Sequence, residues 1–164
     1  MSGIIGRAQS TAGSGIISRE HNNILAVLKK TSAQTFTGSQ LMTFDGVVYN
    51  IGGGWNSSNH QFTPPRAGFY QIFWGGTSKA GSDTVWRANL FVGGSDTLQQ
   101  LRLDNGDGTG YTWGSRTEFL YLGVNDVLEM RGAVDGDGSW YADATLHMDF
   151  NIKYEGTFPN TTFD

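Results

Sequence analysis

The chain has 164 residues, a formal net charge of −4, 24 glycines, no cysteine and 13% aromatic residues. This length suits one domain, and the lack of cysteine excludes disulfides and thiolate metal sites. No basic block marks a nucleic-acid partner, and no apolar run approaches the roughly 18 residues of a membrane-spanning helix. We therefore expect neither nucleic-acid binding nor insertion into a membrane.

Residues 1–33 differ in composition from the rest of the chain. An apolar Gly-Ile-Ile unit occurs twice among them, with small polar residues between the two copies. Such a segment cannot build a core, so it is either a flexible tail or an arm that docks on a partner. We expect an anchoring arm, followed at 24–28 by an apolar run too short to distinguish a helical turn from a strand. The anchoring side chains of the arm are then Ile4, Ile5, Ile16 and Ile17.

From residue 34 onward, apolar and aromatic runs separated by Gly- and Pro-rich turns predict strands about 8–12 residues apart. The expected strands cover residues 34–44, 47–51, 61–63, 68–77, 85–92, 97–103, 111–122, 126–134 and 144–155. About eight to ten strands without a helix of ordinary length are typical of an all-β sandwich or barrel.

Two of these runs are the most informative. From Ala144 to Tyr154 apolar and polar residues alternate without a break, which predicts a long central strand with one buried and one wet face. The run 68–77 instead carries apolar residues on both faces, with Phe69 and Phe73 opposite the face that bears Tyr70 and Trp74. A strand of that kind is buried on both sides or lies against a second subunit.

The run from Phe62 to Ile72 resembles the "F-x-x-P-x-x-G-x-Y-x-F" line of the complement C1q globular head, a tumour-necrosis-factor-like jelly roll. Residues 120–128 are similar to the "L-x-L-x-x-G-D-x-V" line of that family, and residues 150–154 to its closing strand. The resemblance covers residues 34–156 and departs from the family pattern at Ile72, at Asn125 and at Asn151-Ile152, which replaces the glycine step of the closing strand. It implies an antiparallel jelly-roll domain over 34–156, between the arm and a C-terminal tail at 157–164.

No catalytic constellation stands out. The three histidines, His21, His60 and His147, show neither the order of a serine triad nor the spacing of a metal site. Glu118 and Glu129 are expected in neighbouring strands, but a glycosidase needs two carboxylates facing each other across a cleft. Nothing in the sequence indicates such a cleft, so we do not expect an enzyme.

Two Gly-rich loops offer carboxylates of the kind that bind calcium. Because Asp-Gly and Asn-Gly are also ordinary hairpin turns, turn formation is the simpler interpretation, and calcium is the only cofactor considered. The loop carboxylates are those of Asp104, Asp107, Asp135 and Asp137. Three tryptophans in or beside Gly-rich loops, Trp55, Trp113 and Trp140, either stack on sugar rings or pack over the end of the sandwich.

In place of the collagen stalk of animal C1q proteins, this sequence has a short arm, which resembles bacteriophage virion proteins that use the fold as trimeric knobs. We therefore predict a capsid decoration (cement) protein in the virion. Its homotrimer buries Phe69 and Phe73 around a three-fold axis, and its arm binds the major capsid or tail proteins. The alternatives are a host-receptor-binding knob of a tail fibre, which binds a surface glycan, and a carbohydrate-binding module. An arm docked on a shell protein favours the first, and an aromatic groove with glycan affinity favours the others.

Overall fold

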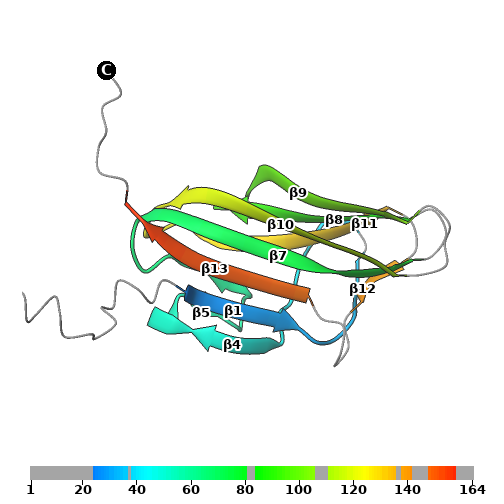
Figure 1. Ribbon diagram of the computed structural model, residues 1–164, viewed down its shortest axis with the longest axis horizontal. Helices are drawn as coiled ribbons and strands as arrows, with labels where there is room; N and C mark the ends of the chain where they lie inside the picture. Colours follow the sequence, from blue (N-terminus) through cyan, green and yellow to red (C-terminus); the bar gives the residue numbers. More distant parts are fainter. Residues whose placement is uncertain are drawn as a thin grey trace, which may run out of the picture.

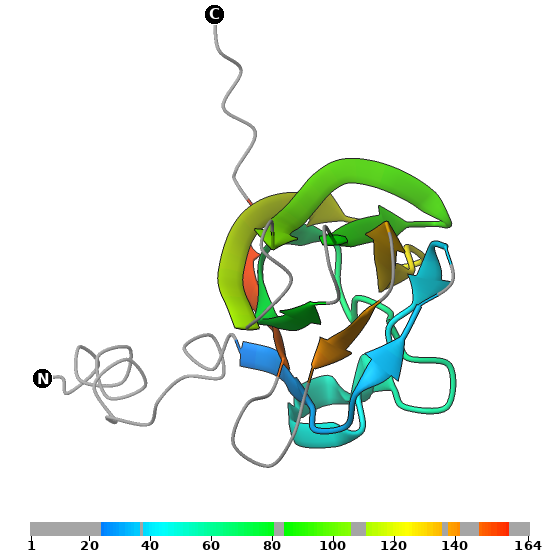
Figure 2. The same ribbon diagram turned by 90° about the vertical axis from the view of Figure 1, so that its right-hand side faces the viewer.

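The computed structural model describes residues 24–36, 38–80, 84–105, 111–135, 138–141 and 148–157. These residues form two antiparallel sheets packed face to face, and the view along the strands shows the two layers enclosing the core (Figures 1 and 2). The all-β antiparallel sandwich predicted from the sequence is confirmed. Among the described residues, one short helical turn, η2 (Ile51–Gly53), lies between the strands β4 and β5.

Sheet A has seven strands and sheet B has six. In sheet A the strands lie side by side in the order β10 (Tyr111–Leu122), β7 (Gly68–Ala80), β13 (Met148–Gly156), β1 (Ile24–Lys30) and β4 (Gly46–Asn50). The strands β12 (Gly138–Tyr141) and β2 (Gln34–Thr35) extend it beside the end of β7. In sheet B the order is β5 (Trp55–Asn56), β6 (Gln61–Phe62), β11 (Leu128–Asp135), β8 (Thr84–Val92) and β9 (Ser95–Asn105), with β3 (Gln40–Leu41) beside β11.

The core lies between the two sheets and follows from the alternation of the long strands. Trp74 of β7, Phe150 of β13 and Trp86 of β8 are all completely buried. In β13 every second residue from Met148 to Tyr154 is buried, and the strand lies between β7 and β1. The predicted central strand with one buried face is therefore confirmed from residue 148 on, while residues 144–147, including His147, lie outside the described residues.

The prediction of one strand over residues 34–44 is wrong. The chain forms β2 in sheet A and β3 in sheet B, and crosses from one sheet to the other between them. Gly38 has a φ of 78°, a backbone conformation that glycine adopts without steric cost. The buried ring of Phe36 marks this crossing, because it packs over Gly132 of β11.

The run at 24–28 proves to be part of a strand, β1, inside sheet A between β13 and β4. Ala26 and Leu28 of β1 are completely buried in the core. The described part of the sandwich therefore begins at Ile24, within the segment that the sequence assigned to the arm. The remainder of the arm, residues 1–23 with its four isoleucines, lies outside the described residues.

The sandwich has two different ends. Ile24, the first residue of β1, is the register partner of Lys153 near the end of β13, so the chain enters and leaves the sandwich at one end, the arm end. At the opposite end, the loop end, Thr84 pairs with Asn105 and Ala80 pairs with Gly138. The links between β7 and β8, β9 and β10, and β11 and β12 therefore all leave from the loop end.

Candidate assembly face

The aromatic residues of β10 point away from the core. Its odd-numbered residues are exposed and its even-numbered residues are half-buried up to Leu122. The exposed set contains Trp113, Phe119 and Tyr121, with 65%, 59% and 59% of their surfaces accessible. The inward set contains Arg116 and Glu118 together with Leu120 and the fully buried Leu122. The strand β10 therefore carries apolar residues on both faces, and its aromatic residues lie on the outer one.

The exposed rings of β10 continue onto β7. Phe119 pairs with Gln71, and Tyr121 pairs with Phe69, so these side chains share the outer face of sheet A. Phe73 lies on the same face one register row further along and is half-buried, as is Phe69. We call the outer-face rings Phe69, Phe73, Phe119 and Tyr121 the aromatic stripe. A contiguous apolar patch of this kind on a folded protein marks an interaction surface.

The sequence indicated Phe69 and Phe73 as interface residues, and the structure places both on the outer face. The sequence-based prediction did not include Phe119 and Tyr121, although their two-residue spacing within one run is visible in the sequence. That spacing does not distinguish a ring facing the core from a ring facing outward. The informative residues are Arg116 and Glu118, which lie on the inward face of β10. Charged side chains seldom occupy core-facing positions, so they could have indicated that the aromatic residues face outward.

Beside the aromatic stripe lies an apolar groove of about 240 Å³. Its lining comes from three adjacent strands, β1, β13 and β7, and consists of Val27, Gln71, Phe73, Asn151, Ile152 and Lys153. The Oδ1 atom of Asn151 is buried and accepts no hydrogen bond within the described part of the chain.

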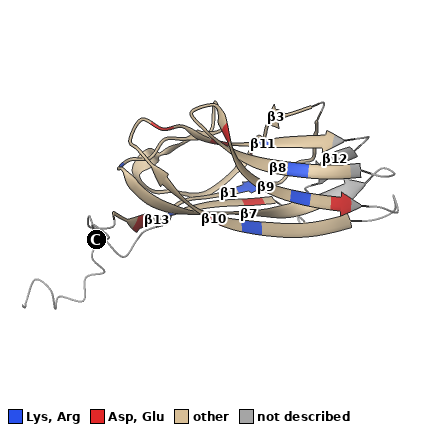
Figure 3. Cartoon of the chain, turned by 90° about the horizontal axis from the view of Figure 1, so that it is seen from above, with Lys and Arg blue, Asp and Glu red and all other residues tan. Residues whose placement is uncertain are grey.

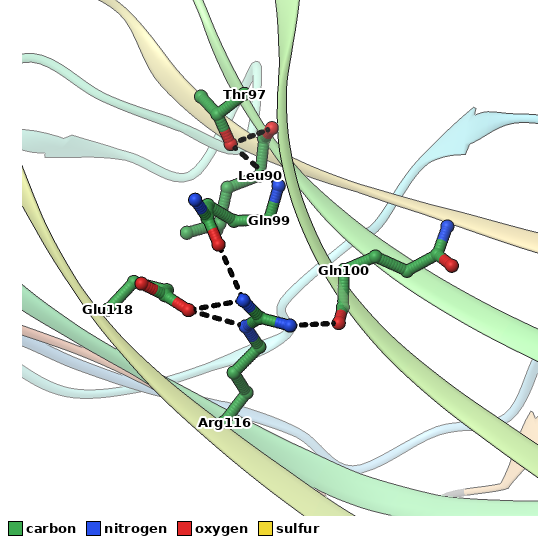
Figure 4. A network of polar contacts seen from close by, with 6 residues as sticks. All are labelled: Leu90, Thr97, Gln99, Gln100, Arg116 and Glu118. Atoms are coloured by element: carbon green, nitrogen blue, oxygen red, sulfur yellow. Dashed lines mark hydrogen bonds and ion pairs between the residues drawn. The ribbon is translucent and has the colours of Figure 1, made fainter.

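The inward-facing polar residues of β10 close the edge of the sandwich towards β9. Arg116 Nε donates to Glu118 at 2.6 Å, Nη1 donates to the carbonyl of Gln100 at 2.7 Å, and Nη2 donates to Gln99 Oε1 at 2.5 Å (Figure 4). The guanidinium thus joins the edge strands of the two sheets. Next to it, Gly114 leaves room for Leu103 of β9, since a Cβ at Gly114 would lie 2.5 Å from Leu103 Cδ2.

Positively and negatively charged residues are both spread along the strands (Figure 3). On the outer face of sheet A, Lys153 forms an ion pair of 2.7 Å with Glu155 two residues further along β13. The aromatic stripe and the groove are therefore predominantly apolar surfaces within a nearly neutral face. Such a face suits contact with another protein surface better than contact with a highly charged polymer.

The three tryptophans do not form one platform. Trp55 is only 4% exposed and packs edge-on against Phe44 and Phe150, with centroids 5.9 and 6.2 Å away, so its proposed stacking on a sugar is wrong. The sequence placed it in a loop, but its neighbours turn the ring into the core. Trp113 is exposed on β10, and Trp140 belongs to β12.

The two Asp-containing segments lie at the loop end. Val85 of β8 pairs with Asp104 on one side and with Asp135 on the other, so the structure brings these two backbone positions into one row. Asp104 lies within β9 rather than in a loop, and its carboxylate pairs with Arg102 at 3.2 Å. Asp107 and Asp137 lie outside the described residues. Within the described chain, no group of three or more metal-binding side chains is found, and calcium binding stays a prediction.

The two glutamates considered for catalysis do not lie in neighbouring strands, and that expectation is wrong. Glu118 belongs to β10 of sheet A, whereas Glu129 belongs to β11 of sheet B, where it is buried and paired with Arg131 at 2.7 Å. The reason is that the chain crosses from one sheet to the other between β10 and β11. His60 Nδ1 accepts a hydrogen bond from the Phe44 backbone N–H at 3.3 Å, and His21 lies outside the described residues. Among the described residues, no helix has the length and apolarity needed to cross a membrane.

No model of a known protein family matches the sequence, and no curated protein matches it. Solved structures do match. The globular domain of zebrafish complement 1qA protein aligns with a TM-score of 0.60 at 14% identity, over 80% of this chain and 97% of that chain. The Eiger TNF from S. frugiperda aligns with a TM-score of 0.64 at 10% identity, over 87% of this chain and 99% of that chain. Identities this low show the fold alone: this chain has the jelly-roll fold that is found in the C1q globular domain and in TNF, as its sequence resemblance implied.

Proposed function

We propose that this protein is a non-enzymatic structural component of a bacteriophage particle, a decoration protein whose jelly roll assembles into a homotrimer. The observation that carries the proposal is the aromatic outer face of β10, which exposes Phe119 and Tyr121 beside the half-buried Phe69 and Phe73. In a monomer these rings stay in contact with water, whereas a self-associating knob gains a preformed apolar surface.

The size of the apolar surface supports self-association. Each exposed ring of the aromatic stripe can lose on the order of 100 Å² of accessible surface in an interface, which contributes roughly 2–3 kcal/mol. Several such rings per protomer exceed the lower estimates of the free-energy cost of association. We expect this face, rather than sheet B, to surround the three-fold axis.

The arrangement of the two ends supports the proposed role in the particle. The chain emerges at Ile24 at the arm end, so an arm bound to a shell protein would hold the loop end away from the particle. The two Gly-Ile-Ile units of the arm then serve as apolar pegs for grooves on the major capsid or tail proteins. Three arms on one trimer would act together through their effective concentration, so a weak single contact could give firm attachment.

The test of the trimer is light scattering on the purified full chain at micromolar concentration, with three times the mass of one chain expected. Phe73→Asp should yield monomers, because it would bury an unpaired carboxylate in the interface. Val124→Asp is the matched control, since Val124 is an exposed apolar residue in the turn between β10 and β11 and should not affect assembly. A wild-type monomer, or a Phe73→Asp trimer, would refute the proposed interface. Electron microscopy of particles labelled on this protein then locates it on the capsid or the tail.

A second candidate function is a glycan-binding knob at a fibre tip. It is favoured by Tyr111 and Trp113, which are exposed on one face of β10 near the loop end. Aromatic faces of this kind stack on the apolar faces of sugar rings. Retention of purified trimer on a glycan array, lost in Trp113→Ala without loss of the trimer, would favour this function over decoration.

A further inference from the structure

Leu98 combines two unfavourable features. Its backbone is left-handed, with a φ of 63°, a conformation that is uncommon for a residue with a Cβ. Its side chain is 83% exposed, the largest value among the exposed apolar residues of the described chain. Local strain that persists in a folded protein is a reason to look for a function at that residue.

The strained residue sits in a bulge of β9. The register between β8 and β9 jumps from Asn89 opposite Gln100 to Phe91 opposite Asp96, which leaves residues 97–99 facing a single residue of β8. A bulge of this kind bends an edge strand and redirects a side chain. We call residues 97–99 the Leu98 bulge.

Side chains on both sides hold the Leu98 bulge in place. Asp96 accepts hydrogen bonds from the Leu98 backbone N–H at 2.8 Å and from Asn89 Nδ2 at 2.9 Å. Thr97 Oγ1 donates to the carbonyl of Leu90 at 2.9 Å. On the far side Gln99 is held by Arg116 of β10, as Figure 4 shows. Hydrogen bonds on both sides of Leu98 therefore hold its backbone in place, while its side chain stays exposed.

The groove on the outer face of sheet A offers a complementary surface. Val27 and Phe73 provide its apolar walls. Lys153, the single charged residue of the lining, is already paired with Glu155. The exposed Leu98 side chain and the groove therefore match in apolarity.

The groove and the Leu98 bulge lie at the same height along the strands. Val27, Asn151, Phe73 and Thr117 form one register row across sheet A. Arg116, next to Thr117, binds Gln99 of the bulge, so Leu98 is within about two residues of that row. If neighbouring protomers are related by a rotation axis that runs along the strands, every residue keeps its position along that axis. Such a rotation can therefore bring the Leu98 bulge of one protomer to the groove of the next.

We propose that Leu98 of one protomer occupies the groove formed by Val27, Phe73 and Asn151 of the neighbouring protomer. This inference rests on the proposed trimer and specifies its contact: two different surfaces meet at each interface, and a ring of three satisfies every groove once. The contact cannot form within one chain. From β10 to β1 there are three strand spacings of about 4.8 Å each, and Leu98 lies on β9, beyond β10.

Disulfide trapping tests the contact, and the natural chain contains no cysteine that could interfere. Full-length Leu98→Cys protein is mixed with full-length Val27→Cys protein, and the mixture is re-equilibrated and oxidised. We expect a covalent pair on a non-reducing gel from the mixture and a covalent trimer from the double variant, in which all three interfaces carry a cysteine pair, but neither product from either single variant. The pair Tyr111→Cys and Val27→Cys is the matched control, because Tyr111 is exposed on β10 but far from the height of the groove.

A second measurement separates a binding role of Leu98 from a structural one. Leu98→Asn should raise the protein concentration at which the trimer half-dissociates by roughly tenfold or more. It should also leave the thermal stability of the dissociated protomer equal or higher, because asparagine tolerates the left-handed backbone. Leu98→Met keeps an apolar side chain and should retain the trimer.

The outcomes distinguish this inference from the proposal on which it rests. A trimer by light scattering without the covalent pair would overturn the Leu98 contact and leave the trimer standing. A wild-type monomer would overturn both. A destabilised Leu98→Asn protomer with unchanged assembly would assign Leu98 to the fold instead of the interface.

Discussion

The ring of Phe69 meets the ring of Tyr121 edge to face, with centroids 5.4 Å apart and planes inclined by 75°. The two residues are register partners on β7 and β10, so the sheet itself sets their distance. Part of the aromatic stripe is therefore ordered within one protomer. An interface built from side chains that are already fixed loses less conformational entropy on association.

A double-mutant cycle tests this pair. Phe69→Ala and Tyr121→Ala should each lower the free energy of unfolding of the protomer, and the double variant should lower it by less than the sum. The expected coupling is about 0.5–1.5 kcal/mol, the usual contribution of an edge-to-face pair, because the pair forms within one protomer. Chemical unfolding of the four proteins measures it. Strict additivity would show that the two rings do not stabilise each other.

The second prediction concerns Lys30, which is 1% exposed and whose Nζ donates to the Thr43 carbonyl at 2.9 Å and to Thr43 Oγ1 at 3.1 Å. Burial lowers the pKa of Lys30 from its ordinary 10.5, and the nearby Asp45 carboxylate offsets only part of that effect. Between the lowered folded pKa and 10.5 the unfolded chain binds more protons. The free energy of unfolding should therefore rise with pH in that interval.

The measurement compares chemical unfolding of the wild type and Lys30→Met at several pH values up to 10.5. The free-energy difference, wild type minus variant, should grow as the pH increases. Lys29→Met controls for the loss of a lysine as such, because Lys29 lies on the outer face of β1 and Lys30 on its core face. A difference that falls with increasing pH would mean that Lys30 is stabilised in its charged form.

The third prediction concerns the crossing between the sheets. A Cβ at Gly132 would lie 2.6 and 2.7 Å from two ring carbons of Phe36, so Gly132→Ala should lower the free energy of unfolding by about 1–3 kcal/mol. Gly123→Ala is the control, because its nearest contact would be Asp126 Oδ2 at an ordinary 3.5 Å. Thermal melting measures both. Adding Phe36→Leu should recover part of the loss, and its failure to do so would place the strain elsewhere.

The fourth prediction concerns the arm. Deleting residues 1–23 should leave the melting temperature and the trimer unchanged, since the described part of the sandwich begins at Ile24. The same deletion should abolish incorporation into particles, measured by the occupancy of labelled protein on purified virions. Changing Ile4, Ile5, Ile16 and Ile17 to Ser in the full chain should have the same effect. Wild-type occupancy of the truncated protein would place the attachment in the jelly roll.

The sequence was most informative where burial and periodicity agree. In β13 every apolar residue from Met148 on faces the core, so alternation alone predicted both the strand and its orientation. In β10 the alternation predicts the strand but not its orientation, because the outward face is the more aromatic one. The orientation of β10 goes with the hydrogen bond from Arg116 to Gln99 of the other sheet. These two residues are 17 positions apart, so the alternation within one run does not show their contact.

Local composition misled where tertiary packing decides. Trp55 follows three glycines and therefore resembles a loop residue, yet its ring is buried against Phe44 and Phe150. Leu98 gave no signal at all, because a left-handed leucine in a bulge depends on the register between β8 and β9. Register between strands is a property of the assembled sheet, and a single run of residues does not contain it.

The pairing of Ile24 with Lys153 also makes the molecule suited to display. A passenger peptide inserted between Asn105 and Tyr111 would leave from the end of the sandwich opposite the arm. A passenger fused behind Gly156 would instead share the end from which the arm emerges. If the arm binds a particle as proposed, a peptide at the first position would point away from the particle surface, and a peptide at the second position would point towards it.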